Sequence, residues 1–257
     1  MVEAMKKRPL KKWIVNILLS AIALAVIYLL WLVLTLPDPA RFEKNNPQTT
    51  ALIEQRRREA KEKGVKFVIK QKWVAYPAVP DMLKKIIRIS EDASFFEHEG
   101  IDYEELKESL KKNWQTGEYS RGGSTITQQL AKNLYLSTEK SVFRKIKEYL
   151  IARRLEKKLS KARIFYLYLN VIEFGQGIFG VEAAAQHYFG TPVTDLTLEQ
   201  MIRLAAVIPR PLTIRADGTS RWLYWHCCWI VEKLFLYHYI DDPTYQTLKS
   251  QFCRTSG

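Results

Sequence analysis

The sequence predicts a mainly α-helical domain that follows one N-terminal transmembrane helix. Residues 13–36 contain no charged side chain, and a helix of that length spans on the order of 36 Å, which exceeds the roughly 30 Å hydrocarbon core of a bilayer. From residue 80 onward, apolar residues recur at helical spacing between capping and breaking residues. The 257 residues suit one folded domain behind this anchor.

A cleaved signal peptide is the alternative to a membrane anchor. Its apolar region would cover about 7–15 residues and would be followed by a small-residue cleavage site. Here the apolar run is longer and ends with Trp31, Leu36 and Pro37, so we expect an uncleaved anchor at residues 13–36. Residues 1–12 carry five basic side chains and one acidic side chain, a net charge of +4. Positive flanks stay in the cytoplasm, so this tail should be cytoplasmic and the rest of the chain should lie across the membrane.

The segments after the anchor follow in chain order. Residues 37–64 are polar and charged, which is typical of a juxtamembrane linker or helix that Gly64 ends. The next stretch, KFVIKQKWVAY, alternates polar and apolar residues and predicts a short strand or extended segment within residues 65–80. Residues 65–257 form one domain, in which helices are expected at residues 81–90, 103–113, 124–133, 141–159, 161–169, 181–189, 198–208 and 221–239.

Local signals mark several boundaries between these helices. Residues 197–200 (TLEQ) form a capping-box pattern, and Pro209 and Pro211 end the helix that follows. Glycines at positions 175, 177 and 180 indicate a loop between two helices. Residues 117–123 contain three glycines and one aromatic residue, so we expect this segment to be mobile.

The charge of the chain limits its partners. The formal net charge is +13, so subtracting the +4 of the N-terminal tail leaves +9 on the remainder. Such an excess attracts polyanions in general. Across a membrane, nucleic acid is a poor partner, and a lipid that carries a diphosphate is a good one.

The sequence contains three cysteines, Cys227, Cys228 and Cys253, and their spacing fits no zinc site. Cys227 and Cys228 lie in a tryptophan-rich apolar stretch, where cysteine packs as a small hydrophobic residue. We therefore expect buried free thiols, and one disulfide bond to Cys253 stays open as the alternative.

The most informative motif is RGGSTITQQLAKN at residues 121–133. Ser124 can cap a helix start, which leaves the backbone N–H groups of the first turn beside the flexible Gly122 and Gly123. Helix N-termini of this kind bind phosphate because their donors lack internal partners and the helix dipole is positive there. Lys132, two turns along the same helix, adds a full positive charge. A capped surface helix is the alternative, so the flanking motifs decide.

Two further motifs flank this helix. Upstream is the acidic, aromatic and histidine-containing segment SEDASFFEHEG at residues 90–100. Downstream, Arg144 and Lys145 precede Glu148 by four and three residues, so the cations and the carboxylate share one helix face. Alone, these features fit an acidic turn and a surface ion-pair ladder worth about 0.3–0.5 kcal/mol per pair. Together, and in this order around an anion-binding helix, they indicate a functional site.

These motifs resemble those of the family 51 peptidoglycan glycosyltransferases. The matching patterns are ED-x-x-F-x-x-H-x-G (residues 91–100), G-x-STITQQ-x-x-KN (122–133), RK-x-x-E-x-x-x-A-x-x-LE (144–156) and a fourth group at residues 168–190. The resemblance covers residues 67–211, and the single-domain anchored layout is similar to the monofunctional biosynthetic members. A bifunctional penicillin-binding protein is disfavoured by the length, and because the S-x-x-K match at residues 137–140 has no K-T-G partner in the sequence.

The resemblance implies a lysozyme-like catalytic domain with a larger head lobe and a small jaw lobe. It also implies polymerisation of lipid II into linear β-1,4 glycan strands, with release of undecaprenyl diphosphate and inversion at the donor sugar. Such an enzyme acts on the periplasmic side of the bacterial inner membrane. Its expected partners are lipid II, the growing glycan strand, the membrane and proteins of cell-wall synthesis or division, but not nucleic acid.

The same resemblance implies the roles of the site residues. Glu91 is the general base that takes the proton of the acceptor's 4-hydroxyl group, and Glu148 is the second catalytic residue, near the departing diphosphate. The residues expected to bind the donor and its diphosphate are Ser124, Thr125, Gln129, Lys132, Arg144 and Lys145. The supporting residues are Asp92, Phe95, His98, Gly100 and Asn133. No cofactor is obligatory, but Mg²⁺ or Mn²⁺ could assist the diphosphate, with Glu148 as the ligand.

The chain departs from the family pattern at three places. Tyr166 stands where the fourth motif has a glutamate, a position that we expect to be structural. Arg210 stands where an asparagine is usual after the late proline, and the terminal helix carries Trp225 and His226 near an expected arginine.

Two alternative functions remain open. A membrane-anchored lytic transglycosylase or muramidase would act on finished glycan, where an acid residue protonates the leaving oxygen. The cations around Glu148 disfavour it, because such an enzyme has no charged leaving group. The other alternative is an inactive scaffold for cell-wall assembly, which the presence of both Glu91 and Glu148 disfavours.

Overall fold

The structure is a computed structural model that describes residues 10–116, 123–139 and 141–253. The chain divides into two compact units, Met1–Pro37 and Asp38–Gly257. Apart from Gly123, the segment that the sequence predicts to be mobile lies outside the described residues.

The first unit contains helix α1 (Leu10–Leu34), whose apolar side chains are largely exposed. This helix belongs to a candidate membrane span, Lys12–Phe42, that is long and apolar enough to cross a bilayer. A helix of the expected kind is therefore present where the sequence predicts the anchor, at residues 13–36.

The second unit is mainly helical, and the predicted fold class is confirmed. In chain order its elements are η1 (Pro39–Phe42), α2 (Ala51–Glu62), β1 (Lys70–Gln71), η2 (Tyr76–Ala78), α3 (Asp81–Glu91), α4 (Tyr103–Thr116), α5 (Ile126–Tyr135), α6 (Val142–Lys158), α7 (Lys161–Val171), β2 (Glu173–Gly175), β3 (Ile178–Phe179), α8 (Val181–Phe189), η3 (Val193–Asp195), α9 (Leu198–Val207), α10 (Arg221–Leu236) and α11 (Asp242–Phe252). All of these elements belong to the one compact unit Asp38–Gly257.

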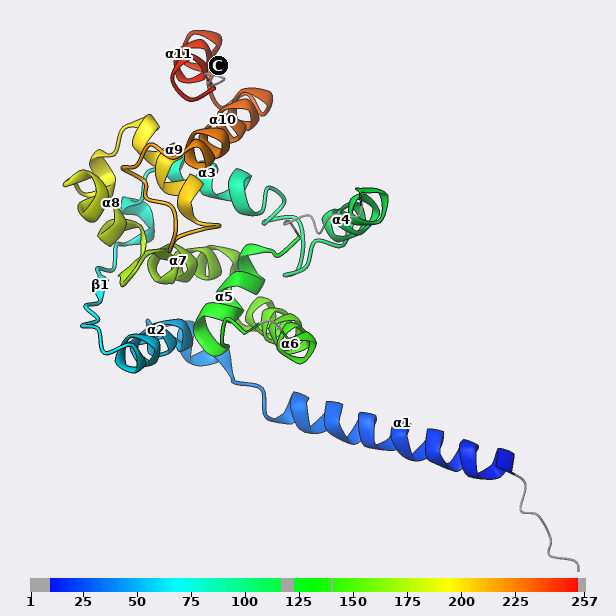
Figure 1. Cartoon of the computed structure of the whole chain (residues 1–257). Helices are drawn as coiled ribbons and strands as arrows, with labels where there is room; N and C mark the ends of the chain where they lie inside the picture. Colours follow the sequence, from blue (N-terminus) through cyan, green and yellow to red (C-terminus); the bar gives the residue numbers. More distant parts are fainter. Residues whose placement is uncertain (1–9, 117–122, 140, 254–257) are drawn as a thin grey trace, which may run out of the picture. The chain divides into compact units, whose positions relative to one another are not determined.

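Helix α5 lies at the centre of the helical packing (Figure 1). It contacts α2, α6 and α7, and its apolar face, which includes Ile126, Leu130 and Ala131, is fully buried. Elsewhere in the unit, α3 packs against α9, and α10 packs against α3, α9 and α11. Burial of these apolar faces stabilises the assembly by about 25 cal/mol per Å² removed from water. Gln129 of α5 bonds to Glu91 at the end of α3, and Ser124, just before α5, accepts a hydrogen bond from Lys145 on α6.

A small three-stranded sheet joins the segment after α2 to the chain after α7. Its strand order is β1-β3-β2, with β1 parallel to β3, Lys70 opposite Ile178, and β2 antiparallel to β3. The extended segment predicted at residues 65–80 therefore contributes only two strand residues. Gly180 follows β3 with a φ of +83°, and a Cβ atom there would lie 2.7 Å from the carbonyl oxygen of Asn170. Only glycine fits this turn into α8.

Each helix predicted from the sequence is present, with boundaries that differ by up to three residues. The juxtamembrane segment contains α2, which the Thr50 side chain caps by accepting from the Ile53 N–H group. Helix α11 was not predicted, although its signals are in the sequence. Asp241 caps it by accepting a hydrogen bond from the Thr244 N–H group at 3.0 Å, and Pro243 stands in its first turn.

For the cysteines, the expectation of a buried free thiol holds for Cys227, and the alternative left open, a disulfide bond to Cys253, is the one that forms. Cys227 is a buried free thiol, but Cys228 and Cys253 form a disulfide bond with a Cα–Cα distance of 5.1 Å. Neighbouring residues on a helix point about 100° apart, so Cys227 faces the core when Cys228 faces α11. The expectation of free thiols failed for Cys228 and Cys253 because the unpredicted α11 is the element that brings Cys253 back to α10.

Candidate active site

Glu91 is the last residue of α3 and lies beside α5. The helix ends here because Asp92 leaves helical geometry, with a φ of −169° and a ψ of 81°. The Glu91 carboxylate accepts hydrogen bonds from Gln129 Nε2 at 2.8 Å and, more weakly, from Ser90 Oγ at 3.4 Å. Burial raises the pKa of Glu91 to about 7, although these two donors and the positive charge of Lys132 act to lower it. A carboxyl group with this pKa exchanges protons readily near neutral pH.

Asp92 is adjacent to Glu91 but has a structural task. It is 2% exposed, and its carboxylate accepts hydrogen bonds from the Ile126 N–H group and from His98 Nε2, each at 2.9 Å. The Nδ1 atom of His98 accepts from the Gly100 N–H group at 3.1 Å, which assigns the ring proton to Nε2. Asp92 and His98 therefore join the first motif to the N-terminus of α5, where the helix dipole favours negative charge.

Thr125, not Ser124, caps helix α5. The Thr125 side chain accepts a hydrogen bond from the Gln128 N–H group, and the Gln128 side chain accepts one from the Thr125 N–H group. The prediction that Ser124 is the cap was wrong because this reciprocal capping box requires Gln or Glu three residues after the cap. The buried Thr125 hydroxyl group also donates to the Gly100 carbonyl oxygen at 2.7 Å, so its side chain is engaged within the protein.

Phe95 and Gly100 fix the loop after α3 against α6 and α7. Phe95 is fully buried, with its ring centre 5.6 Å from that of Phe165 and 4.4 Å from the ammonium group of Lys161. Gly100 has a φ of +86°, and a Cβ atom there would lie 2.9 Å from Glu156 Cγ on α6. Both residues therefore hold the loop after α3 in place by packing.

Glu148 lies on α6 between two cations. It is 3% exposed, and its two carboxylate oxygens pair with the Arg144 guanidinium group and the Lys145 ammonium group, as the spacing predicts. The Lys145 ammonium group also donates to Ser124 Oγ at 2.9 Å, which ties α6 to the start of α5. Two cations around one buried carboxylate leave a net positive charge at this end of the site.

Lys132 of α5 is the electrostatic link between the two acidic residues. Its charge is attracted by both Glu148 and Glu91 and is repelled by Arg144 and Lys145. Burial is the largest influence and lowers the pKa of Lys132 below its ordinary value. Lys132 is therefore within electrostatic range of both Glu91 and Glu148.

Gln129 connects the same site to a residue that sequence reasoning missed. Its Nε2 atom donates to Glu91 and lies 3.5 Å from the Ser124 carbonyl oxygen, and its Oε1 atom accepts a hydrogen bond from the Tyr168 hydroxyl group at 3.0 Å. Tyr168 opens the Tyr-Leu-Asn group of the fourth motif, but local sequence cannot reveal a contact between α5 and α7. Asn133, the last supporting residue predicted, is buried within α5.

The three departures from the family pattern make contacts of their own. The Tyr166 hydroxyl group accepts a hydrogen bond from Asn46 Nδ2 at 3.1 Å, which is consistent with a structural role. The Arg210 guanidinium group lies 4.8 Å from the ring centre of Trp222. His226 is buried, its Nδ1 atom donates to a backbone carbonyl group of α9 at 2.9 Å, and burial lowers the pKa of its ring.

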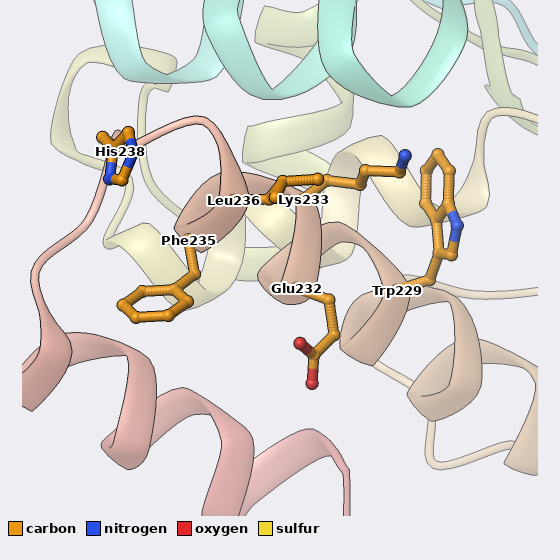
Figure 2. Close-up of a pocket in the computed structure, with 6 residues that line it drawn as sticks. All are labelled: Trp229, Glu232, Lys233, Phe235, Leu236 and His238. Atoms are coloured by element: carbon orange, nitrogen blue, oxygen red, sulfur yellow. The ribbon is translucent and has the colours of Figure 1, made fainter.

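The hollow drawn in Figure 2 lies elsewhere. Its volume is about 400 Å³, and the residues that line it are Trp229, Glu232, Lys233, Phe235, Leu236 and His238. They belong to the C-terminal part of α10 and the turn after it. The predicted site residues do not line this hollow, so the side chains around Lys132 define the candidate active site.

The surroundings of Glu148 do not fit a divalent cation. Both carboxylate oxygens are engaged by Arg144 and Lys145, and these positive charges would repel a metal ion. In the described part of the chain, the one cluster of three potential ligands consists of Cys228, Glu232 and Cys253, and its cysteines are disulfide-bonded.

Comparison with known proteins identifies the class of enzyme. A family model described as Transglycosylase matches residues 59–234. The chain belongs to this transglycosylase family, and it is accordingly a glycosyltransferase enzyme of peptidoglycan synthesis.

Several curated proteins are similar to the chain over most of its length. It is 39% identical to the biosynthetic peptidoglycan transglycosylase of Nitrosospira multiformis, over 83% of this chain and 91% of that protein. Proteins of the same name from Laribacter hongkongensis and Dechloromonas aromatica are 42% and 44% identical, over 78% and 79% of this chain and 86% of each of those proteins. The crystal structure of Penicillin-Binding Protein 1A from Haemophilus influenzae matches with a TM-score of 0.41 and 20% identity, over 70% of this chain and 18% of that one. A match at that level does not by itself define the fold.

Proposed function

We propose that this chain polymerises lipid II into linear β-1,4 glycan strands and releases undecaprenyl diphosphate. Membership of the transglycosylase family supports the reaction class. The observation that carries the finer proposal is the difference between the two acidic residues on either side of Lys132. Glu91 has a pKa of about 7, whereas Glu148 is paired with two cations.

In this mechanism Glu91 is the general base. Its carboxylate takes the proton of the acceptor's 4-hydroxyl group while the oxygen forms a bond to the anomeric carbon of the donor. The bond from that carbon to the diphosphate oxygen breaks, and its electron pair leaves with the lipid diphosphate. A base with a pKa near the working pH combines a useful fraction of carboxylate with adequate proton affinity. Attack from the face opposite the leaving group inverts the α-linked donor to a β-linked product.

The leaving group needs positive charge more than it needs a proton. Lys132, Arg144 and Lys145 supply that charge beside Glu148, which orients the last two through its ion pairs. The exposed Ser124 hydroxyl group and the Gln129 amide border the same region and are the polar groups that we assign to the donor. With three protein cations at hand, the reaction requires no obligatory cofactor.

We propose that the reaction takes place on the periplasmic face of the bacterial inner membrane, with a cytoplasmic N-terminus. The apolar helix α1 and the +4 charge of residues 1–12 support this orientation. The disulfide bond between Cys228 and Cys253 supports it independently, because disulfides persist in oxidising compartments. Lipid II is accessible there, and proteins of cell-wall synthesis or division are the further partners that we propose.

The test is polymerisation of lipid II by the detergent-solubilised full chain, with products separated on a gel. Wild type should give glycan ladders that moenomycin abolishes. Glu91→Gln should lower turnover by about 100- to 10,000-fold, the range for loss of a general base, and should still bind lipid II. Glu97→Gln is the matched control, because Glu97 is an exposed glutamate of the same motif.

Other outcomes would replace this proposal. Full turnover by Glu91→Gln would mean that another group is the base. Cleavage of preformed sacculi by the wild type would indicate a lytic enzyme. If neither polymerisation nor cleavage occurred, the scaffold would be the better description.

A further inference from the structure

A chain of two hydrogen bonds ends at the Glu91 carboxylate. The Tyr168 hydroxyl group lies 3.0 Å from Gln129 Oε1, and Gln129 Nε2 lies 2.8 Å from Glu91 Oε2. The three residues come from α7, α5 and α3 and are distant in sequence. Tyr168 is fully buried, so its hydroxyl group depends on partners within the protein.

The chemistry of the hydroxyl, amide and carboxylate groups decides which of them donates and which accepts in these two hydrogen bonds. An ionised carboxylate can only accept hydrogen bonds, so the Gln129 amide must present its NH₂ group to Glu91. Its carbonyl oxygen then faces Tyr168, which must donate. Burial, together with the negative charges of Glu91 and Asp92, raises the pKa of Tyr168 well above its ordinary value. The tyrosine hydroxyl group therefore keeps its proton and remains a donor throughout the working pH range.

We propose that Tyr168 is a positioning residue that, by locking the Gln129 amide, keeps the Glu91 carboxylate ionised and oriented as the base. This inference rests on the proposed role of Glu91. Holding the Gln129 amide in one orientation matters because its oxygen and its NH₂ group are nearly equal in shape. A 180° rotation of the amide would exchange their positions. A reversed amide would offer its oxygen to Glu91, and only a protonated carboxyl group can donate to that oxygen.

Loss of the Tyr168 hydroxyl group should therefore favour the protonated form of Glu91. The other groups that face Glu91 would stay in place. Lys132 on α5 and the Ser90 hydroxyl group lower the pKa of Glu91, and the Asp92 charge raises it. A change in the titration of Glu91 in Tyr168→Phe could then be assigned to the amide alone.

A purely structural role is the competing explanation, since Tyr168 also packs against Phe165 with a ring-centre distance of 6.3 Å. Tyr188→Phe is the matched control. Tyr188 is also buried, and its hydroxyl group donates to the Phe174 carbonyl oxygen at 2.8 Å. Both substitutions remove one buried tyrosine hydrogen bond and should lower the midpoint of thermal unfolding by a similar amount. Only the change at Tyr168 should alter the pH dependence of catalysis.

The experiment measures kcat and KM for lipid II between pH 5.5 and 9.5 for the full chain in detergent. For Tyr168→Phe we expect the acidic limb of the plot of kcat against pH to move to a pH about one unit higher. At pH values below this limb, kcat should then be about tenfold lower than that of wild type. The loss should shrink above pH 9, where Glu91 is ionised in both proteins. Tyr188→Phe should keep the wild-type profile.

The outcomes separate this inference from the proposed function. An unmoved profile for Tyr168→Phe, with Glu91→Gln inactive, would overturn the role of Tyr168 and leave Glu91 as the base. Turnover by Glu91→Gln would overturn both. If Tyr168→Phe does not fold, Gln129→Met provides the second test, because it removes the donor to Glu91 without adding charge. Its acidic limb should also move up, and an unmoved limb would overturn the inference.

Discussion

Glu91 and Asp92 are adjacent in the chain, yet the fold gives their carboxyl groups different tasks. Asp92 accepts hydrogen bonds from the first N–H group of α5 and from His98, so its charge is well compensated. Glu91 receives one strong hydrogen bond, and burial dominates its titration. The proton affinity of a single carboxyl group thus depends on how many hydrogen-bond donors reach it and on how far the fold excludes water from it.

The raised pKa of Glu91 predicts a stability effect with a defined sign. The ordinary pKa of a glutamate side chain is 4.5, and that of Glu91 in the folded protein is about 7, so the native state binds the extra proton between these values. Stability is therefore lost as the pH rises from about 4.5 to about 7. Glu91→Gln removes this loss and should be more stable than wild type by about 1 to 2 kcal/mol at pH 8. The partial exposure of Glu91 keeps the gain below the full shift.

Thermal unfolding followed by tryptophan fluorescence at pH 4.5 and pH 8 measures this effect. The stability difference between Glu91→Gln and wild type should be small at pH 4.5 and should grow towards pH 8. The exposed Glu97→Gln should differ from wild type equally at both pH values. A stability difference that did not change with pH would show that burial does not penalise the Glu91 charge.

Helix α2 shows how an element is attached to the site-bearing core. The Arg56 guanidinium group forms a bidentate pair with Glu173 on β2 at 2.8 Å and also contacts Glu59. The side chains of Arg56 and Glu173 are 14% and 5% exposed. Gln55 accepts a hydrogen bond from the Thr138 N–H group at 2.8 Å, just after α5. Because α2 is the first long helix of the unit Asp38–Gly257, these bonds attach the N-terminal part of that unit to the core around α5.

We expect Arg56→Ala to destabilise the protein by about 3 kcal/mol, because Glu173 would remain buried without its cation. The neighbouring Arg57→Ala should cost less than about 0.5 kcal/mol, since Arg57 is 54% exposed and pairs with Glu54 on the surface. Chemical denaturation measures both values. Hydrogen exchange should show that the amides of α2 lose protection in Arg56→Ala. Equal losses of stability in Arg56→Ala and Arg57→Ala would contradict the conclusion that the Arg56–Glu173 pair holds α2 to the core.

At the scale of the whole molecule, charge and anchoring act together. Subtracting the +4 of residues 1–12 from the total of +13 leaves +9 on the rest of the chain. In the proposed reaction, an excess of this size beside a membrane would raise the local concentration of anionic lipids, including a lipid diphosphate. The cations around Glu148 then act at short range, where salt screens them less than it screens exposed charges.

If the overall charge attracts the substrate at long range and the cations at Glu148 act at short range, salt should affect KM and kcat differently. Between 0.05 and 0.5 M NaCl, KM for lipid II should rise several-fold, because the screening length falls from above about 10 Å towards about 3 Å. The value of kcat should change less, because the ion pairs of the buried Glu148 carboxylate are formed at contact distance within the protein. Steady-state kinetics in a nonionic detergent measure both parameters. A constant KM over this range would show that the overall charge does not assist substrate binding.

Much of the fold and of the candidate site could be predicted from sequence. The helices follow from local periodicity and caps, and Glu148 with its two cations follows from i+3 and i+4 spacing on one helix. The predictions failed where distant segments meet. Thr125 replaced Ser124 as the cap through its pairing with Gln128, and the disulfide bond needed α11 to return to α10. Tyr168 was missed as a partner of Gln129 because the two residues lie on different helices.

The sequence by itself determined the apolar anchor, the helical class and the chemical groups available for catalysis, because hydropathy, period and residue type are local properties. Only the tertiary structure decided which of those groups share a site and which is suited to accept a proton. Glu91 and Glu148 both come within electrostatic range of Lys132 because α6 packs against α5 and Gln129 of α5 bonds to the end of α3. The pKa of about 7 at Glu91 arises from burial among segments distant in sequence, and the removal of water from a side chain is a property of the packed chain.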